Sequence, residues 1–142
     1  AVERAPKSVT AWFNKGLFHQ RLKETENAAA CFAKVLELKP DHPEALQSLA
    51  AIHIESRHYD RAADLYKEAL GHMPGAGLSI RYNLACAYAM NHETGKALDT
   101  LQGIVDDGFD RIDLLMQDEQ LENVRRTKGF RRLLEDLESR KP

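Results

Sequence analysis

The sequence predicts an all-α fold, a right-handed superhelical solenoid of antiparallel helix pairs. The first observation is a repeat, because Pro6, Pro40 and Pro74 are spaced 40 − 6 = 34 and 74 − 40 = 34 residues apart. The second is that apolar residues recur at i, i+3, i+4 and i+7, the spacing of a helix face and not of a strand. A fixed period of this length indicates stacked units, each burying its apolar face against its neighbours.

Each period contains two predicted helices separated by a short break. A proline follows the second helix and ends it, because its ring cannot continue the hydrogen-bonded ladder. In chain order the predicted helices cover residues 8–22, 27–38, 43–56, 61–70, 78–90 and 96–105. The segment from Pro74 to Gly77 is interpreted as the turn that lengthens the third spacing to 35 residues.

Large, small and aromatic residues recur at the same spacing in each period. The matching residues are Trp12, Gly16, His19, Ala28, Phe32 and Pro40, then Leu46, Leu49, Ala50, His53, Ala62, Tyr66 and Pro74, then Leu84, Ala85, Tyr88, Ala97 and Leu101. This pattern resembles the tetratricopeptide repeat signature, W-x2-L-G-x2-Y followed by A-x3-F and P. The resemblance implies stacked helix pairs that act as a protein-binding scaffold.

Small residues are expected where the two helices of a pair cross, since only a small side chain lets two backbones approach closely. These residues are Gly16, Ala50 and Ala85 on the first helices and Ala28, Ala62 and Ala97 on the second. Two positions depart from the motif: Lys15 replaces the usual leucine, and Arg81 stands where a large apolar residue is usual.

The repeat predicts five segments along the chain. They are residues 1–6, the tail of a preceding repeat in a longer array, the repeats 7–40, 41–74 and 75–109, and a C-terminal cap over 110–142. Asp118 and Thr127 are predicted N-caps of two short helices in this cap. Its predicted apolar stripe consists of Leu121, Val124, Phe130, Leu133, Leu134 and Leu137.

Composition indicates an ordinary globular protein and excludes several functional classes. The 142 residues are 43% hydrophobic and 30% charged, with a net charge of −2. Acidic and basic residues are interspersed along the chain, so the sequence predicts no basic surface for nucleic acid. The absence of a run of about 18 apolar residues predicts no membrane insertion. We interpret Cys31 and Cys86 as free thiols in small spaces, which favours a cytoplasmic location.

The sequence predicts neither catalysis nor a bound metal or cofactor. His19 and His53 fall in the packed position that Tyr88 occupies, and the other histidines fall in separate turns. No HExxH, CxxC or GxSxG motif is present. The basic cluster at residues 125–132 is interpreted as a solvated helix face, with a site for an acidic partner as the alternative.

The predicted functional site is the concave wall formed by the first helix of each pair. Its residues are Phe13, Asn14, Leu17, Gln20, Arg21, Gln47, Ser48, Ala51, Ile54, Glu55, Tyr82, Asn83, Cys86 and Met90. Asn14 and Asn83 share one register, where an amide can both donate to and accept from a peptide main chain. The alternative is that the chain's own tail fills this wall.

We therefore expect an adaptor that binds a peptide or helix of a partner protein. Two alternatives remain: self-association into a homo-oligomer through the N-terminal face, or the regulatory repeat array of a larger enzyme. Binding of a heat-shock chaperone tail is not expected, because the positions that carry lysine, arginine and asparagine in such receptors hold Phe13, Leu17, Ser48, Ser79 and Asn83 here, without a cation among them.

Overall fold

The computed structural model describes residues 5–73 and 77–141, which form helices and turns without a strand. The chain divides into two compact units, Ala1–Pro74 and Gly75–Pro142. We call them the N-terminal and C-terminal units and describe each by itself. The predicted turn at Pro74–Gly77 lies largely outside the described residues, and the predicted repeat boundaries stay predictions.

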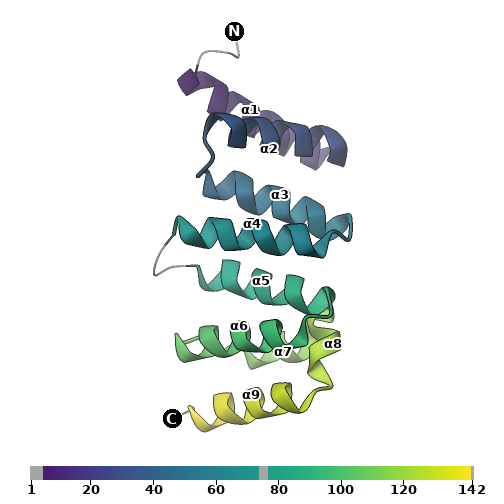
Figure 1. Ribbon diagram of the computed structural model, residues 1–142, viewed down its shortest axis with the longest axis vertical. Helices are drawn as coiled ribbons and strands as arrows, with labels where there is room; N and C mark the ends of the chain where they lie inside the picture. Colours follow the sequence, from purple (N-terminus) through teal and green to yellow (C-terminus); the bar gives the residue numbers. More distant parts are fainter. Residues whose placement is uncertain (1–4, 74–76, 142) are drawn as a thin grey trace. The chain divides into compact units, whose positions relative to one another are not determined.

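The N-terminal unit consists of two helix pairs (Figure 1). Its helices are α1 (Ala5–Arg21), α2 (Thr25–Leu38), α3 (Pro43–Glu55) and α4 (Tyr59–Gly71). Helix α1 packs on α2, α3 packs on α4, and α2 contacts α3 across the two pairs. The four helices predicted for this part of the sequence are confirmed, with ends that shift by a few residues.

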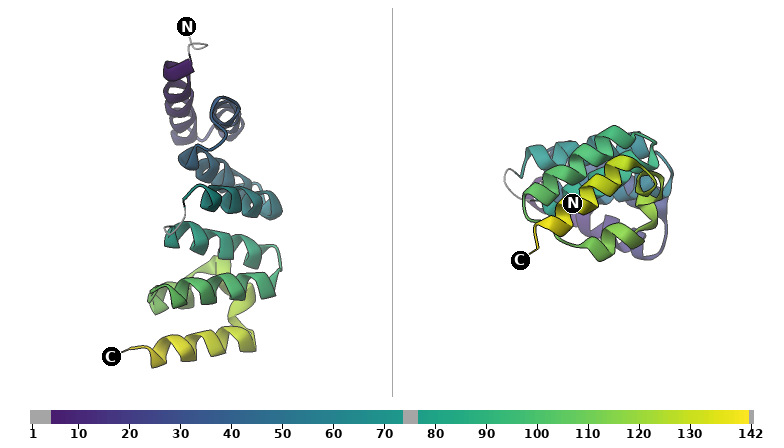
Figure 2. Two further views of the ribbon diagram at one scale, coloured as in Figure 1. Left: turned by 60° about the vertical axis from the view of Figure 1, so that its left-hand side comes forward. Right: turned by 90° about the horizontal axis from the view of Figure 1, so that it is seen from below.

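The C-terminal unit consists of one helix pair and a set of shorter helices. These are α5 (Leu78–Met90), α6 (Thr94–Asp106), α7 (Ile112–Gln117), the 3-10 turn η1 (Glu119–Leu121), α8 (Glu122–Arg125) and α9 (Lys128–Ser139). Helix α5 packs on α6, η1 and α8 contact α5, and α9 contacts α6 (Figure 2). The predicted caps are confirmed: the carboxylate of Asp118 accepts from Gln120 N–H, and the hydroxyl of Thr127 accepts from Phe130 N–H.

The first helix of every pair ends in the same turn. Lys23, Arg57 and His92 have φ angles of 61°, 64° and 60°, in the left-handed region. Their spacings are 57 − 23 = 34 and 92 − 57 = 35 residues, so the sequence period is also a period of backbone conformation. In each turn an N–H bonds back five residues, as from Glu24 to His19 O at 2.9 Å, which is the Schellman arrangement that satisfies carbonyls at a helix end.

Helix α6 ends without the proline that follows the earlier second helices in the sequence. Gly108 has a φ of 108°, and the N–H of Phe109 donates to Ile104 O at 2.9 Å. Glycine adopts this conformation without steric cost. A glycine-based Schellman turn therefore replaces proline here and leaves Phe109 free to pack.

The core of the N-terminal unit lies where the small residues were predicted. Ala28 and Phe32 on α2 are fully buried and pack with Ile52 of α3. A Cβ atom built on Gly16 would lie 2.7 Å from the Phe32 ring. Glycine at position 16 therefore lets α1 rest directly on that ring, as the motif predicts.

Gly16→Ala is expected to destabilise the protein by roughly 1 kcal/mol. Alanine favours a helix by about 1 kcal/mol over glycine, but crowding a rigid buried ring costs about 1–3 kcal/mol. Gly95→Ala is the matched control, because nothing lies within 4 Å of a Cβ at that position of α6. Urea denaturation should show a loss for the first variant and no loss for the second; equal effects would contradict the close contact.

Arg81, the unusual residue of the third pair, forms an ion pair in place of an apolar contact. Its Nη1 lies 2.6 Å from the Asp107 carboxylate. A Cβ on Gly103 would lie 3.0 Å from Nη2 of Arg81. The missing side chain at 103 therefore makes room for the guanidinium group, which explains how an arginine is accommodated in this position.

Candidate partner-binding site

The predicted wall residues of the N-terminal unit lie on α1 and α3 and all keep exposed surface. They are Phe13, Asn14, Leu17, Gln20, Arg21, Gln47, Ser48, Ala51, Ile54 and Glu55, and we call this surface the α1–α3 wall. Phe13 and Leu17 are half-buried and pack against the core cluster that contains Phe32 and Ile52. The Phe13 ring lies 5.6 Å from Phe32 and 5.0 Å from His42, measured between ring centroids. These apolar side chains are thus held in place while part of each stays open.

Most polar side chains on this wall form no hydrogen bond or ion pair with a residue that the structure describes. The side chain of Asn14 is exposed and forms no hydrogen bond with any residue that the structure describes. The amide of Gln47 donates to Pro43 O at 3.4 Å, within its own helix. Gln20 and Glu55 border a recess of about 280 Å³, together with Lys23, Thr25 and Ile52. The wall therefore combines four apolar side chains with six polar ones, and the amides of Asn14 and Gln20 have no hydrogen-bond partner among the described residues.

The expectation of an open wall needs a correction in the C-terminal unit. Tyr82 and Cys86 are only 7% and 1% exposed. The Tyr82 hydroxyl donates to the Asp118 carboxylate at 2.6 Å, and the Phe109 ring stacks on Tyr82 with centroids 5.5 Å apart. Asn83 and Met90 are half-buried. The predicted grip of Asn14 and Asn83 on one ligand stays a prediction.

Residues 112–125, which form α7, η1 and α8, cover Tyr82 and Cys86, and we call them the covering segment. Leu115, Leu121 and Val124 of this segment are fully buried. Asn123 donates to Ala89 O at the end of α5, at 3.3 Å. On α5, the structure therefore shows the alternative, in which C-terminal residues of the same chain cover the wall.

A further arginine holds the covering segment together. One nitrogen of Arg125 donates to Leu115 O at 3.0 Å and to Asp118 O at 2.7 Å. These carbonyls lie at the end of α7, where backbone acceptors lack helical partners. Sequence reasoning placed Arg125 in a solvated basic cluster, but the side chain is half-buried and has a structural role.

The buried cysteine beside Asp118 is not a nucleophile. Burial, and then the nearby Asp118 carboxylate, raise the pKa of Cys86 to about 12. Burial and the hydrogen bond to Asp118 also raise the pKa of Tyr82. Because the thiolate is the reactive form of cysteine, the neutral thiol of Cys86 serves packing. Both cysteines are free and buried, as the sequence predicts.

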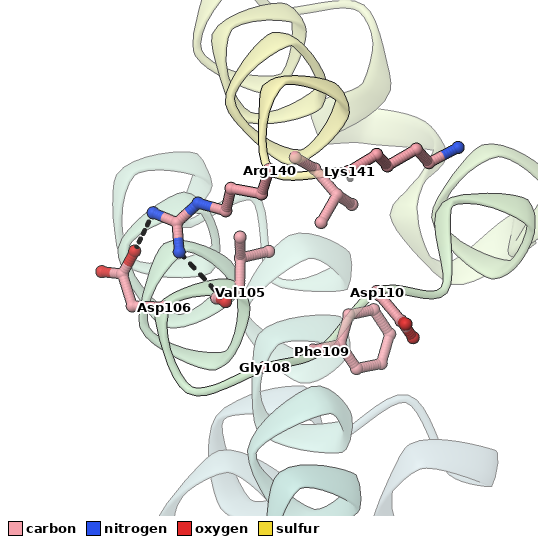
Figure 3. Close-up of a pocket in the computed structure, with 8 residues that line it drawn as sticks. Val105, Asp106, Gly108, Phe109, Asp110, Arg140 and Lys141 are labelled. Carbon is pink, nitrogen blue, oxygen red and sulfur yellow. Dashed lines mark hydrogen bonds and ion pairs between the residues drawn. The ribbon is translucent and has the colours of Figure 1, made fainter.

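A second hollow of about 270 Å³ lies between the ends of α6 and α9 (Figure 3). Val105, Phe109 and Leu137 provide its apolar lining. Arg140 reaches from α9 to Asp106, 2.6 Å away, and to Val105 O, 3.4 Å away. Arg140 also lies 2.9 Å from the Asp136 carboxylate. The guanidinium group of Arg140 is therefore already paired, and it joins α9 to α6 across this hollow.

Two histidines occupy equivalent positions but have different neighbours. His19 Nδ1 lies 2.7 Å from Glu24 Oε1, whereas the ring of His53 faces His58 with centroids 5.8 Å apart. Burial lowers the pKa of His53, His58 and Arg61 lower it further, and Asp60 opposes them. We therefore expect His53 to make the second helix pair sensitive to acid.

The N-terminal unit is expected to lose stability as the pH falls below about 6.5, the ordinary pKa of histidine. The folded state binds the His53 proton less tightly than the unfolded chain, so unfolding takes up protons in this range. Free energies of unfolding at about pH 7.5 and about pH 5.5 should differ less in His53→Gln than in the wild type. His72→Gln, at an exposed position, is the control; an unchanged pH dependence in His53→Gln would contradict the prediction.

Across the described part of the chain, no three potential metal-ligating side chains come together. Searched over the same residues, no helix has both the length and the apolar character needed to span a membrane.

Residues 8–74 match a family model described as tetratricopeptide repeat. Residues 8–74 are tetratricopeptide repeats. The chain is 31% identical over 70 residues to the tetratricopeptide repeat-containing protein trd-1 of Caenorhabditis elegans, which is 49% of this chain and 9% of that protein. The chain spans about a tenth of the length of the curated relatives that it matches.

Solved tetratricopeptide structures share the fold of this protein. MamA superposes with a TM-score of 0.77 at 19% identity, covering 94% of this chain and 70% of MamA. The first tetratricopeptide domain of Spaghetti, solved with a bound HSP90 peptide, gives 0.63 at 12% identity, covering 92% of this chain and 93% of that domain. At these identities the likeness establishes the fold, an all-α arrangement of stacked helix pairs.

Proposed function

We propose that this protein is an interaction scaffold whose α1–α3 wall binds a segment of a partner protein. The observation that carries the proposal is the pairing of half-exposed Phe13 and Leu17 with the unpartnered amide of Asn14. Supported apolar side chains beside polar groups that can fix orientation are typical of a site for a protein segment. The side chains are already supported by the core, so binding requires little ordering of the wall.

The comparisons support a scaffold role in general terms. Tetratricopeptide repeats generally provide surfaces that hold other proteins, and the Spaghetti domain was solved with a peptide. The cations expected of a chaperone-tail receptor are absent here, since the corresponding positions are Phe13, Ser79 and Asn83. The proposed ligand is therefore not a carboxylate terminus of that kind.

The proposal is tested by measuring the affinity of a captured partner for wall variants. Asn14→Ala and Leu17→Ser should each weaken binding by about tenfold or more, since one lost anchor of about 1.4 kcal/mol has this effect. Met116→Ser is the matched control, because Met116 is an exposed apolar residue of the C-terminal unit. Unchanged affinity in both wall variants would exclude the wall as the binding site.

Self-association is the second candidate, and one surface favours it. Phe18 on α1 and Leu22 just after it are 59% and 53% exposed. Ile52, which occupies the register of Phe18 (52 − 18 = 34), is only 5% exposed because the preceding pair covers it. Concentration-dependent sedimentation that Phe18→Asp abolishes and Met116→Asp leaves intact would support this candidate.

A further inference from the structure

Helix α9 carries three exposed cations at its start, Lys128, Arg131 and Arg132, and we call them the α9 basic patch. Residues three and four positions apart on a helix are neighbours on one face, so Lys128 adjoins both arginines. The opposite face of α9 is buried through Phe130 and Leu133. The patch therefore points away from the core of the C-terminal unit.

The cations of the α9 basic patch form no hydrogen bond or ion pair with a residue that the structure describes. By contrast, the guanidinium groups of Arg81, Arg111 and Arg140 all lie within 2.9 Å of a carboxylate. Glu135 follows on the same helix, but among the described residues no ion pair joins it to the patch. The unit therefore provides partners for those three arginines and none for the α9 basic patch.

The position of the patch is unfavourable for α9 itself. The N-terminal end of a helix carries a partial positive charge, so acids stabilise the first turn and bases stabilise the last. Helices α2, α3 and α4 follow this rule, with Glu26, Glu44 and Asp60 in their first turns. Helix α9 has no acid in its first turn, and its acids Glu135 and Glu138 come after the cations. An anion bound at the patch would relieve a repulsion that no described residue relieves.

The start of α9 is held firmly, so the patch is presented in a fixed arrangement. The hydroxyl of Thr127 accepts from Phe130 N–H at 3.1 Å and caps the helix. A Cβ atom built on Gly129 would lie 2.5 Å from Cδ1 of Leu98, so the first turn of α9 rests directly on α6. Binding a ligand at the patch therefore requires little ordering of the backbone.

Carboxylates on both sides of the patch limit what can bind there. Before it, Glu122 lies 3.5 Å from Arg126, and after it Glu135 and Glu138 are exposed on α9. A nucleic acid carries negative charge along its whole length and would meet these carboxylates as well as the patch. A short cluster of carboxylates can match the three cations without reaching the flanking acids.

We propose that the α9 basic patch docks a short, acidic segment of a partner protein. The cations supply the attraction and the flanking acids set the length of the segment that fits. The patch belongs to the C-terminal unit and uses no residue of the α1–α3 wall. It is therefore a second contact surface, whose failure in a test would leave the proposed function of that wall untouched.

The proposal is tested on the full chain with fluorescein-labelled hexaglutamate, followed by fluorescence anisotropy. Binding should be saturable, and a labelled hexaglutamine peptide should not bind. The affinity should fall at least about tenfold when NaCl is raised from about 50 mM to about 500 mM, because salt screens interactions between exposed charges.

Two double variants locate the binding. Lys128→Glu/Arg131→Glu should weaken hexaglutamate binding at least about tenfold. Its C-terminal unit should be no less stable to urea than the wild type, because acids are favourable in the first turn of a helix. Lys34→Glu/Lys67→Glu is the matched control, since it reverses two exposed lysines of the N-terminal unit and changes the net charge equally. The control should leave the affinity unchanged.

Three results would overturn the proposal. Equal losses in the two double variants would mean that hexaglutamate responds only to overall charge. No binding at about millimolar concentration would mean that the patch is only a solvated helix face. A single-stranded RNA hexamer that binds more tightly than hexaglutamate, and that Lys128→Glu/Arg131→Glu releases, would assign the patch to nucleic acid.

Discussion

Phe32→Ala is expected to lower the free energy of unfolding of the N-terminal unit by about 3–5 kcal/mol. The Phe32 ring is fully buried, lies under Gly16, and contacts Ala28, Ile52 and Phe13. Removing it leaves a cavity that α1 and α3 cannot close, because both are held by their own partner helices. A loss of this size is a large fraction of the roughly 5–15 kcal/mol that stabilises a typical domain. Urea denaturation followed by circular dichroism and Trp12 fluorescence measures the effect.

Phe18→Ala is the matched control for this prediction. It deletes the same side chain from the same unit, but Phe18 is 59% exposed. Surface substitutions of this kind usually change stability by less than about 0.5 kcal/mol. Similar losses in the two variants would show that Phe32 is not the centre of this core.

Asp118→Ala is expected to destabilise the C-terminal unit by about 2–4 kcal/mol. The substitution leaves the buried Tyr82 hydroxyl without its acceptor, which costs about 1–3 kcal/mol. It also removes the cap that accepts from Gln120 N–H at 2.9 Å, and a lost cap costs roughly 1 kcal/mol. The covering segment should open more often, so a thiol reagent should modify Cys86 faster. Cys31→Ala in the background makes Cys86 the only thiol measured.

Two comparisons separate this effect from a general loss of charge. Asp113→Ala removes an exposed carboxylate whose Arg111 partner is also exposed, and such pairs contribute little. Tyr82→Phe combined with Asp118→Ala should lose less than the sum of the single variants, because both remove one hydrogen bond. Additive losses, or unchanged labelling of Cys86, would contradict the role assigned to Asp118.

The covering segment also limits where a partner can bind. Tyr82 and Cys86 are inaccessible while residues 112–125 lie on α5. Leu115, Leu121 and Val124 of this segment are fully buried, and burying such a side chain contributes about 1.5–3 kcal/mol. Displacing it would therefore be costly for a ligand. This is why the proposed site is confined to α1 and α3.

Much of the fold could be predicted because its determinants are local. The proline and alanine spacing places the helices, and Gly16 opposite Phe32 follows from the packing of two helices only a few residues apart in sequence. Asp118 and Thr127 were predictable as caps for the same reason, since a cap bonds within three residues. The left-handed turns at Lys23, Arg57 and His92 were missed, because none carries the glycine that usually marks that conformation.

What the sequence alone determined is the repeating helix pair, its crossing residues and the register that makes Phe13, Asn14 and Leu17 a wall. The tertiary structure alone decided which part of that register stays open. Tyr82 and Asp118 are 36 residues apart and meet only because the chain folds back over α5. A periodic pattern specifies which side chains share a face, but it is the same whether that face meets water, another protein or a distant segment of the same chain.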